Sequence, residues 1–273
     1  GQLRAASGQI VQVQARKELA ALAYLLLEGG QAQSRDLLQA LLWGDLNTES
    51  ARNNLRVALS RLQSLIGPTE NTTATPKLLQ TSRIDVQLNP AAPIWVDVTV
   101  FLELLAKTRH HEHASRSACL PCFQTLQKAV ELYQAEFLAG FALADSPAFE
   151  EWLFLQRERL HVLVSDAYRD LAAYAETTED WRGARSYAQR QIELDPLCEP
   201  AYRQQMRLLI RQGERSAALA VFERCRQQLY EELGLDPEAE TLALHMGGAL
   251  VAGANEPRGA VFTLTLPLGP EAS

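Results

Sequence analysis

The sequence predicts a mainly α-helical protein, with a mixed α/β segment at its start and a short β-hairpin at its end. Three observations predict this class. Apolar residues recur at helical spacing along most of the chain. Two helical stretches align with each other at an offset of 34 residues, which indicates helical repeats. Short runs rich in β-branched residues lie near both ends of the first 96 residues and return after residue 249.

The first 96 residues predict the parts of a winged helix-turn-helix in chain order. The opening GQLRAASGQIVQVQ favours two short strands around Ser7 and Gly8. In RKELAALAYLLLEGG, apolar residues at 19, 22, 23, 26 and 27 form a helical stripe that ends at two glycines. Ser34 is a good N-cap for a second helix, SRDLLQALLW, which carries Asp36 in its first turn.

A third helix extends to Gly67 and Pro68, with Asn47 or Thr48 as its N-cap. A polar loop follows, and LLQTSRIDVQLNP then predicts a hairpin around Ser82 and Arg83. On a period of 3.6 residues, one side of the third helix is expected to be buried. The residues of this stripe are Ala51, Leu55, Leu59, Leu62 and Ile66.

The other faces of the third helix are suited to DNA. Arg can bind guanine bidentately, Asn can bind adenine, and Val can meet a thymine methyl group. A helix with three arginines is also an ordinary solvated surface, but the capped helix before it and the hairpin after it favour recognition of the major groove. We expect DNA to be faced by Arg52, Asn53, Arg56, Val57, Ser60 and Arg61, by Thr81, Ser82 and Arg83 at the wing tip, and by Arg16, Lys17 and Arg35 at backbone phosphates.

The charge of the chain is uneven. The net charge is −7, yet residues 1–96 carry nine Lys/Arg against seven Asp/Glu, while residues 97–273 carry seventeen against twenty-six. Affinity for phosphate depends on the local basic surface rather than on the average of the chain. The first part can therefore bind DNA although the protein as a whole is acidic.

Residues 97–246 predict stacked pairs of helices. DAYRDLAAYAETTEDWRGA (166–184) aligns without gaps on PAYRQQMRLLIRQGERSAA (200–218), which is the tetratricopeptide period. Small residues let paired helices approach closely, and stacked pairs bury a core that one pair cannot. Helices expected at 121–136 and 148–176 continue the stack. The remaining residues, 247–273, predict a hairpin around the turn NEPRG.

Histidines and cysteines occur close together in the stretch RHHEHASRSACLPC. A CxxC beside an HxH can surround zinc tetrahedrally, because thiolate and imidazole are its usual ligands. The expected ligands are His111, His113, Cys119 and Cys122, in a structural site without an open position for a substrate. Two other interpretations stay open: a polar loop whose cysteines lie one turn apart on a helix and pack, and a disulfide between Cys119 and Cys122.

Composition and motifs exclude several classes of protein. The chain is 47% hydrophobic and 22% charged, which is typical of globular proteins, and no apolar run approaches the roughly 18 residues that cross a bilayer. Four cysteines are too few for a disulfide framework, so we expect a cytoplasmic protein with no membrane partner. GxSxG, HExxH and GxxxxGK[ST] are absent, so we expect no enzyme and no cofactor besides the structural zinc.

Several stretches of the chain carry a family resemblance. The first part contains RKELAALAYLLLEGG, SRDLLQALLWGD, ESARNNLRVALSRLQSLIG and IWVDVTVFLELL. The second part contains AVELYQAEFLAGFALADSPAFEEWLFLQRERL and RQIELDPLCEPAYRQQMRLLIRQGERSAALAVFERCRQQLYEELGLDPEAET. Over about residues 16–244 the chain resembles bacterial transcriptional activators that join a response-regulator-type winged helix to the bacterial transcriptional activator domain, as in antibiotic regulatory proteins. DSPAFEEW and ELGLDPEAET are its most specific stretches.

The resemblance implies an activator in phosphorelay-type signalling that binds repeated promoter sites, usually as two copies, and recruits RNA polymerase. Together with the order of the expected elements, it divides the chain into three parts: a DNA-binding domain at 1–96, an activator domain at 97–246 and a tail at 247–273. The tail resembles the closing hairpin of histidine-kinase ATP-binding domains but lacks their phosphate-binding boxes, so we expect no ATP binding. The opening sheet is short for the family and the chain begins on Gly1, so we expect a truncated or processed start. The rival interpretation is a tetratricopeptide-type scaffold that binds proteins and not DNA.

Overall fold

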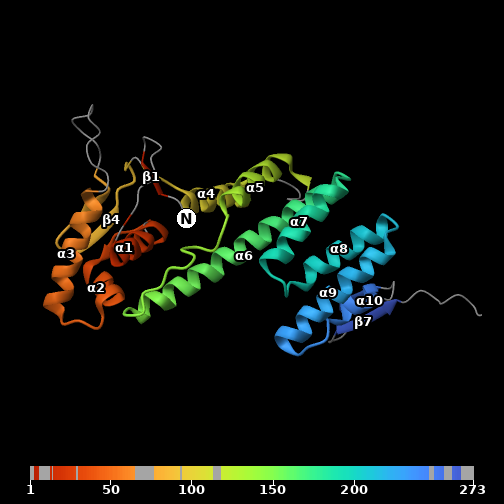
Figure 1. The fold of residues 1–273 in the computed structure, drawn as a ribbon. Helices are drawn as coiled ribbons and strands as arrows, with labels where there is room; N and C mark the ends of the chain where they lie inside the picture. The colour runs from red at the N-terminus through yellow and green to blue at the C-terminus, as the bar shows by residue number, and fades with distance from the viewer. Residues whose placement is uncertain are drawn as a thin grey trace, which may run out of the picture. The chain divides into compact units, whose positions relative to one another are not determined.

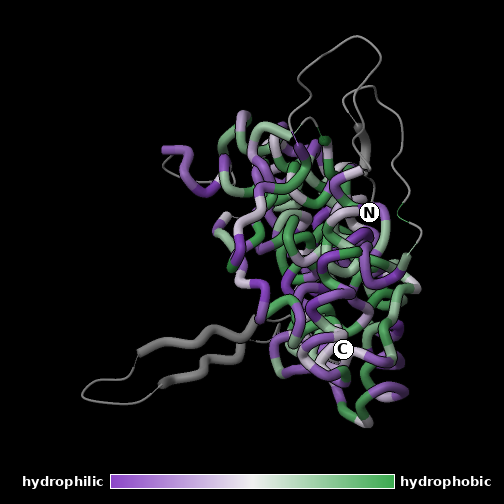
Figure 2. The backbone as a smooth tube through the Cα atoms, turned by 90° about the vertical axis from the view of Figure 1, so that its left-hand side faces the viewer, coloured by the Kyte–Doolittle hydropathy of each residue, from purple (hydrophilic) through white to green (hydrophobic). Residues whose placement is uncertain are grey.

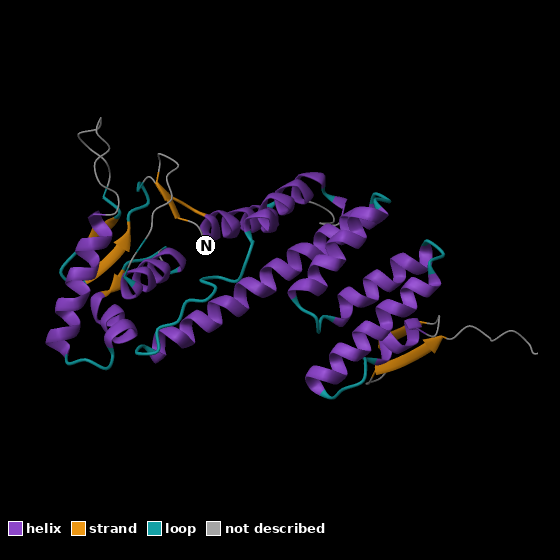
Figure 3. Cartoon of the chain, viewed as in Figure 1, coloured by secondary structure: helices purple, strands orange, loops and turns teal. Residues whose placement is uncertain are grey.

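The computed structural model describes residues 3–5, 13, 15–28, 30–64, 77–92, 94–112, 118–245, 249–254 and 260–265. Helices account for most of these residues and the strands are short (Figure 3), so the predicted mainly α-helical class is confirmed. Hydrophilic and hydrophobic residues alternate at short intervals along the helices (Figure 2), as amphipathic helices require. The chain forms two compact units, residues 1–110 with 128–162 and residues 111–127 with 163–273.

The first unit opens with the predicted winged helix, in which α1, α2 and α3 pack beside a small sheet (Figure 1). The three helices pack on one another, α1 also contacts β4, and α3 also contacts β3. The elements in chain order are β1 (Leu3–Ala5), α1 (Arg16–Leu27), β2 (Gln33–Ser34), α2 (Arg35–Trp43), α3 (Thr48–Ser64), β3 (Leu79–Thr81), β4 (Asp85–Leu88) and β5 (Ile94–Val96).

Short polar side chains set where α2 and α3 begin. Ser34 Oγ accepts a hydrogen bond of 3.0 Å from the N–H of Leu37, as predicted for an N-cap. Asn47 Oδ1 accepts one of 2.9 Å from the N–H of Ser50. Asn47, rather than Thr48, is therefore the residue that caps α3.

The strands pair over long distances in the sequence. β4 is the central strand of an antiparallel sheet with the order β2-β4-β3, and β3 and β4 form the predicted second hairpin. The opening strand β1 is antiparallel to β5, with Leu3 opposite Val96. The predicted turn at Ser7 and Gly8 lies outside the described residues. The partner of β1 is thus about 90 residues away in the chain, which local periodicity cannot reveal.

Helix α1 is buried on more sides than its predicted stripe. Every residue from Ala20 to Leu25 is at most 9% exposed, whereas Leu19, Leu26 and Leu27 are only half-buried. The predicted helix is confirmed, and its burial extends beyond the apolar stripe because α1 has neighbours on several sides. Besides α2 and α3, it contacts Trp152, whose ring centroid lies 5.1 Å from that of Tyr24.

Helices follow through the rest of the chain, and α5 and α6 contribute residues to both units. In the first unit, Phe101 and Leu105 of α4 are buried. DSPAFEEW (145–152) spans the start of α6, and its Ser146, just before the helix, donates a hydrogen bond of 2.8 Å to the carbonyl oxygen of Leu42. The helices are α4 (Asp97–His110), α5 (Leu120–Leu132), α6 (Pro147–Thr177), α7 (Trp181–Leu194), α8 (Glu199–Arg211), α9 (Arg215–Leu233) and α10 (Ala239–His245).

The second unit contains the predicted repeat. Matching alanines are buried in both copies: Ala167 is 2% and Ala201 0% exposed, and Ala184 is 0% and Ala218 4% exposed. The absence of longer side chains at these positions lets α8 pack directly on α7 and α9. Gly213 makes the turn between α8 and α9 with a φ of +78°, a conformation that favours glycine.

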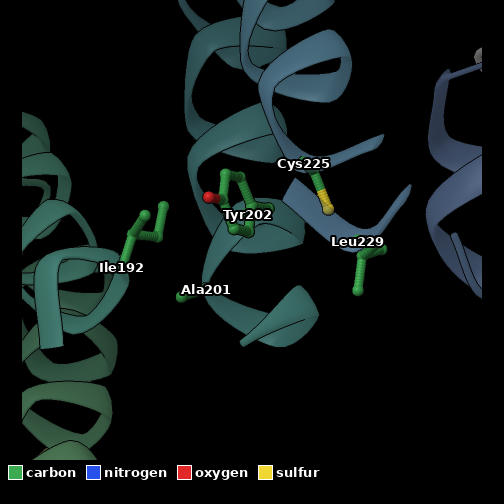
Figure 4. Close-up of a cluster of buried hydrophobic side chains, with 5 residues drawn as sticks. All are labelled: Ile192, Ala201, Tyr202, Cys225 and Leu229. Atoms are coloured by element: carbon green, nitrogen blue, oxygen red, sulfur yellow. The ribbon is translucent and has the colours of Figure 1, made fainter. Parts of the chain in front are cut away.

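One core cluster joins three of these helices. Figure 4 shows Ile192 of α7, Ala201 and Tyr202 of α8, and Cys225 and Leu229 of α9, all at most 5% exposed. Burial raises the pKa of the Cys225 thiol to about 12, because an apolar environment disfavours the thiolate. The cluster therefore holds this thiol in its neutral form.

The chain ends in the predicted antiparallel hairpin, formed by β6 (Ala249–Ala254) and β7 (Ala260–Thr265). Ala249 is opposite Thr265 and Ala254 is opposite Ala260. The turn NEPRG between the strands lies outside the described residues. In the part of the chain that the structure describes, every helix is too short or too polar to span a membrane.

Candidate nucleic-acid interface

Helix α3 separates an apolar side from a polar side. Ala51, Leu55, Leu59 and Leu62 are at most 5% exposed, which confirms the predicted buried stripe apart from Ile66, a residue outside the described ranges. Ala58 is buried as well. Of the residues expected to face DNA, Val57 is half-buried, and the exposed ones are Arg52, Asn53, Arg56, Ser60 and Arg61.

Two of the exposed side chains on α3 are joined. Arg56 Nη2 donates a hydrogen bond of 3.0 Å to Oδ1 of Asn53, one helical turn earlier. Residues three apart on a helix lie on the same face, so both side chains point to the same side of α3. The contact holds an arginine and an asparagine next to each other, and these two residue types can read guanine and adenine.

The wing tip is held by local hydrogen bonds. Ser82 Oγ accepts from the N–H groups of Ile84 and Asp85, at 3.1 and 2.9 Å. Arg35 Nε donates 3.0 Å to the carbonyl oxygen of Ser82, which ties the wing to the start of α2. Thr81, Ser82 and Arg83 are all exposed, so the ordered tip presents the predicted side chains to solvent.

A groove runs between α3 and the wing. Gln63 fixes its width, because its Oε1 accepts a hydrogen bond of 2.9 Å from the N–H of Leu79. Cationic side chains dominate its charge, a feature suited to a phosphate backbone. The polar residues along it are Arg35, Arg56, Ser60, Gln63, Ser64, Lys77 and Thr81.

Arg61 has a contact within the first unit. Its Nη1 lies 2.9 Å from Oε1 of Glu18 on α1, although the Arg61 side chain is 65% exposed. The pair links α1 to the last part of α3. Arg61 therefore serves the packing of the two helices while remaining accessible to solvent.

Lys17 has its partners within the first unit. Its ammonium group donates to Ser146 Oγ at 2.8 Å and to the carbonyl oxygen of Leu42, and lies 3.0 Å from Oδ2 of Asp145. Three acceptors match the three N–H groups of a lysine. In the structure Lys17 therefore joins α1 to the DSPAFEEW segment, and its phosphate contact remains a prediction.

Arg16 also contacts the segment before α6. Its Nη2 donates 2.6 Å to the carbonyl oxygen of Ala142, and its guanidinium carbon lies 5.3 Å from the centre of the Phe141 ring. An arginine held by stacking and a hydrogen bond is less available to DNA than a free one. Its phosphate contact remains a prediction.

Three residues of this surface did not emerge from the sequence pattern. Lys77 lies two residues before β3, and Gln63 accepts a hydrogen bond from the first residue of this strand, but both stand beside a polar loop without periodicity. Ile84 is 72% exposed at the wing tip, where an alternating strand pattern would have placed it inside. The basic side chain of Lys77 is the only signal in the sequence that could have placed it among the candidates for a phosphate contact.

The predicted metal ligands come together in the second unit. One ligand atom from each of His111, Cys119 and Cys122 lies within 4.8 Å of the others. His113, the fourth predicted ligand, lies outside the described residues. Both cysteines are free thiols, so the alternative of a disulfide between them is not what the structure contains.

A winged helix joined to stacked helical pairs is also found in a solved structure. The chain is similar to Mycobacterium tuberculosis EmbR in complex with a low-affinity phosphopeptide, with a TM-score of 0.62 and 19% sequence identity. The similarity covers 87% of this chain, and this chain spans 60% of the length of that one. At this identity the comparison shows the fold. No curated protein matches the sequence.

Residues 96–247 match the family described as the bacterial transcriptional activator domain. This match takes in more than half of the chain, and with the shared fold it defines a transcription regulator of the activator class rather than a class of enzyme. The chain belongs to the bacterial transcriptional activator domain family. DSPAFEEW, which contacts α1 through Ser146 and Trp152, lies within the matched residues.

Proposed function

We propose that this protein is a sequence-specific activator that binds promoter DNA through its winged helix. In this proposal α3 enters the major groove, the wing contacts the phosphate backbone, and the helical repeats contact RNA polymerase. Fixed phosphate contacts set the register of the helix, and the side chains of α3 then read the base edges.

The exposed face of α3 is the observation that carries the proposal. Four side chains able to bind bases or phosphates, Arg52, Asn53, Arg56 and Ser60, project opposite a stripe that is almost fully buried. The same face borders the groove that contains Arg35 and Lys77. An ordinary surface helix needs no other basic side chains beside it. A helix that binds DNA requires them, because the phosphates of the DNA backbone must be neutralised.

Protein contacts are proposed for the second unit. Large apolar side chains are exposed toward the end of α9 and just after it: Tyr230 is 69%, Leu233 53% and Leu235 57% exposed. Apolar side chains that gather on a surface are typical of interaction sites. They support a partner protein, which we propose is RNA polymerase, and they are also the observation that favours the scaffold alternative.

Two further parts of the proposal follow from the family resemblance. We propose that two copies bind together on repeated half-sites, since a single winged helix buries too little surface for high specificity. We also propose a cytoplasmic location, because bacterial promoters and RNA polymerase meet there. The ratio of protein to DNA in native mass spectra of the complex tests the first of these.

Selection of bound fragments from a random DNA pool tests the central proposal. The expected result is an enriched sequence motif, bound by the full chain with an affinity that falls steeply as salt rises from 50 to 200 mM, because counterions are released from phosphates. A scaffold that binds only proteins would enrich no motif and would show no such salt dependence. That result would leave the fold and the family intact but would remove DNA binding.

A further inference from the structure

Three side chains that commonly bind zinc meet where α5 begins. His111 Nδ1 lies 3.5 Å from Cys119 Sγ and 3.5 Å from Cys122 Sγ. All three ligand atoms lie within 4.8 Å of one another, and within the described ranges no other set of three His, Cys, Asp or Glu ligands is this close. These three residues are not part of the surface proposed to bind DNA, so the site can be tested independently of that proposal.

The distances match those of a tetrahedral metal centre. Zinc–nitrogen bonds of about 2.0–2.1 Å and zinc–sulfur bonds of about 2.3 Å, at a tetrahedral angle, place the nitrogen and each sulfur about 3.6 Å apart. Hydrogen bonds account less well for both contacts, because Nδ1 has either one hydrogen or one lone pair, according to the tautomer. One ion bound to all three atoms accounts for both separations at once.

The surroundings suit a bound cation. Cys119 is 8% and Cys122 2% exposed, so the sulfurs are shielded, while His111 is exposed and leaves a route for the ion to enter. Cys119 immediately precedes the 13-residue helix α5, and Cys122 lies in its first turn. The positive end of a helix favours anionic ligand atoms such as thiolates.

We propose that His111, Cys119 and Cys122 bind one zinc ion that fastens His111 to the start of α5. Two thiolates and an imidazole are a soft donor set that selects zinc over calcium or magnesium. The role is structural: the ion closes the loop between His111 and Cys119, which reduces the conformational freedom of the unfolded chain.

Cobalt substitution tests the site directly. The full chain is stripped with a chelator under reducing conditions and titrated with Co²⁺, which has visible absorption bands that are strong only in tetrahedral sites. We expect one Co²⁺ per chain, a thiolate-to-cobalt charge-transfer band in the near ultraviolet, and loss of both signals when Zn²⁺ is added. Zinc binding should also release protons, because the ligands bind in their deprotonated forms.

Variants identify the ligands. Cys119→Ser and Cys122→Ser should each reduce the charge-transfer band by about half, because each removes one thiolate, and the double variant should abolish it. His111→Ala should weaken zinc binding by more than about 100-fold, since loss of an outer partner alone costs about 10–100-fold. His110→Ala and Cys198→Ser are the matched controls and should leave both signals unchanged.

Circular dichroism of each variant separates loss of the site from loss of the fold. If the folded wild-type chain binds no Co²⁺ at tens of micromolar, the proposal is overturned. It is also overturned if the folded double cysteine variant keeps the charge-transfer band. Thiol titration of freshly purified protein that finds Cys119 and Cys122 oxidised to a disulfide would overturn it as well.

Discussion

Arg56 donates a hydrogen bond of 3.0 Å to Asn53 on the exposed face of α3. The contact orients the guanidinium and the side-chain amide before any ligand arrives, so less rotamer entropy is lost on binding. Arg56 also lines the groove toward the wing. One residue therefore belongs both to the face proposed to read bases and to the groove proposed to receive the backbone.

Arg56→Ala should weaken binding to the selected DNA site by about 1–3 kcal/mol if Arg56 reads a base, and should relax the preference at one position of the site. The side chain is exposed, so the fold should not change. Fluorescence anisotropy with the selected site and with single-base variants measures both effects. Arg207→Ala, an exposed arginine of α8, is the control; equal affinity of Arg56→Ala and wild type would remove Arg56 from the reading surface.

Lys77→Gln should act differently, because Lys77 lines the groove beside α3 but lies on the wing side. We expect weaker binding to all sequences alike and a salt-dependence slope reduced by about 0.9, as for one lost phosphate contact. The affinity is measured at several salt concentrations for specific and random DNA. Lys128→Gln, on the exposed surface of α5, should leave the slope unchanged; an altered base preference in Lys77→Gln would contradict a pure phosphate role.

Lys17→Ala should destabilise the first unit rather than act on DNA alone. The substitution removes the ammonium donor from Ser146, Leu42 and Asp145. Ser146 still donates to the Leu42 carbonyl oxygen and the Asp145 side chain is 61% exposed, so we expect a loss of about 0.5–1.5 kcal/mol. Urea unfolding compares it with Lys107→Ala, an exposed lysine of α4. If Lys17→Ala leaves the stability unchanged and weakens DNA binding, Lys17 contacts a phosphate as the sequence predicts.

The buried thiol of Cys225 should make stability depend on pH in the alkaline range. Its pKa is raised from 9.0 to about 12 in the folded protein, so the unfolded chain loses this proton first as pH rises. The stability contributed by the protonated Cys225 thiol is intact below pH 9. Between pH 9 and 12 it is lost, and the free energy of unfolding falls by up to about 1.4 kcal/mol per pH unit.

Cys225→Ala tests this dependence. The free energy of unfolding, measured in urea from pH 8 to 11, should fall less steeply with pH in this variant than in the wild type. Leu229→Ala is the control, because it removes a neighbour in the same buried cluster without removing a titrating group. If the free energy of unfolding of Cys225→Ala falls with pH as steeply as that of the wild type, groups other than Cys225 determine the loss of stability at alkaline pH.

Local features of this protein were predictable because their causes lie within a few residues. The buried stripe of α3 follows from leucine spacing, and the start of α2 from Ser34, whose hydroxyl can reach the N–H three residues on. The second hairpin was predicted from strand-forming residues on either side of Ser82 and Arg83. In the repeat, the paired alanines at 184 and 218 were recognised by their spacing and are buried as expected.

Partners far apart in the sequence were not predictable. Lys17 and Ser146 are separated by 129 positions, so no periodicity indicates that the lysine points into the first unit. The same holds for β1 and β5, and for the Trp152 ring that covers α1 beside Tyr24. These contacts show that the Lys17 ammonium has partners within the first unit and that α1 is buried beyond its apolar stripe.

By itself, the sequence of this protein determined its helices, their caps, its repeat and the family to which it belongs, because each depends on residue types at short and regular spacings. The tertiary structure alone decided which charged side chains are available. Lys17 and Arg61 are both cations of the first 96 residues that were expected to contact DNA. Packing brings the Lys17 ammonium to three acceptors within the first unit and leaves the Arg61 side chain 65% exposed. The reason is physical: a cation binds whichever acceptor the fold brings within about 3 Å, and that neighbour need not be near in the sequence.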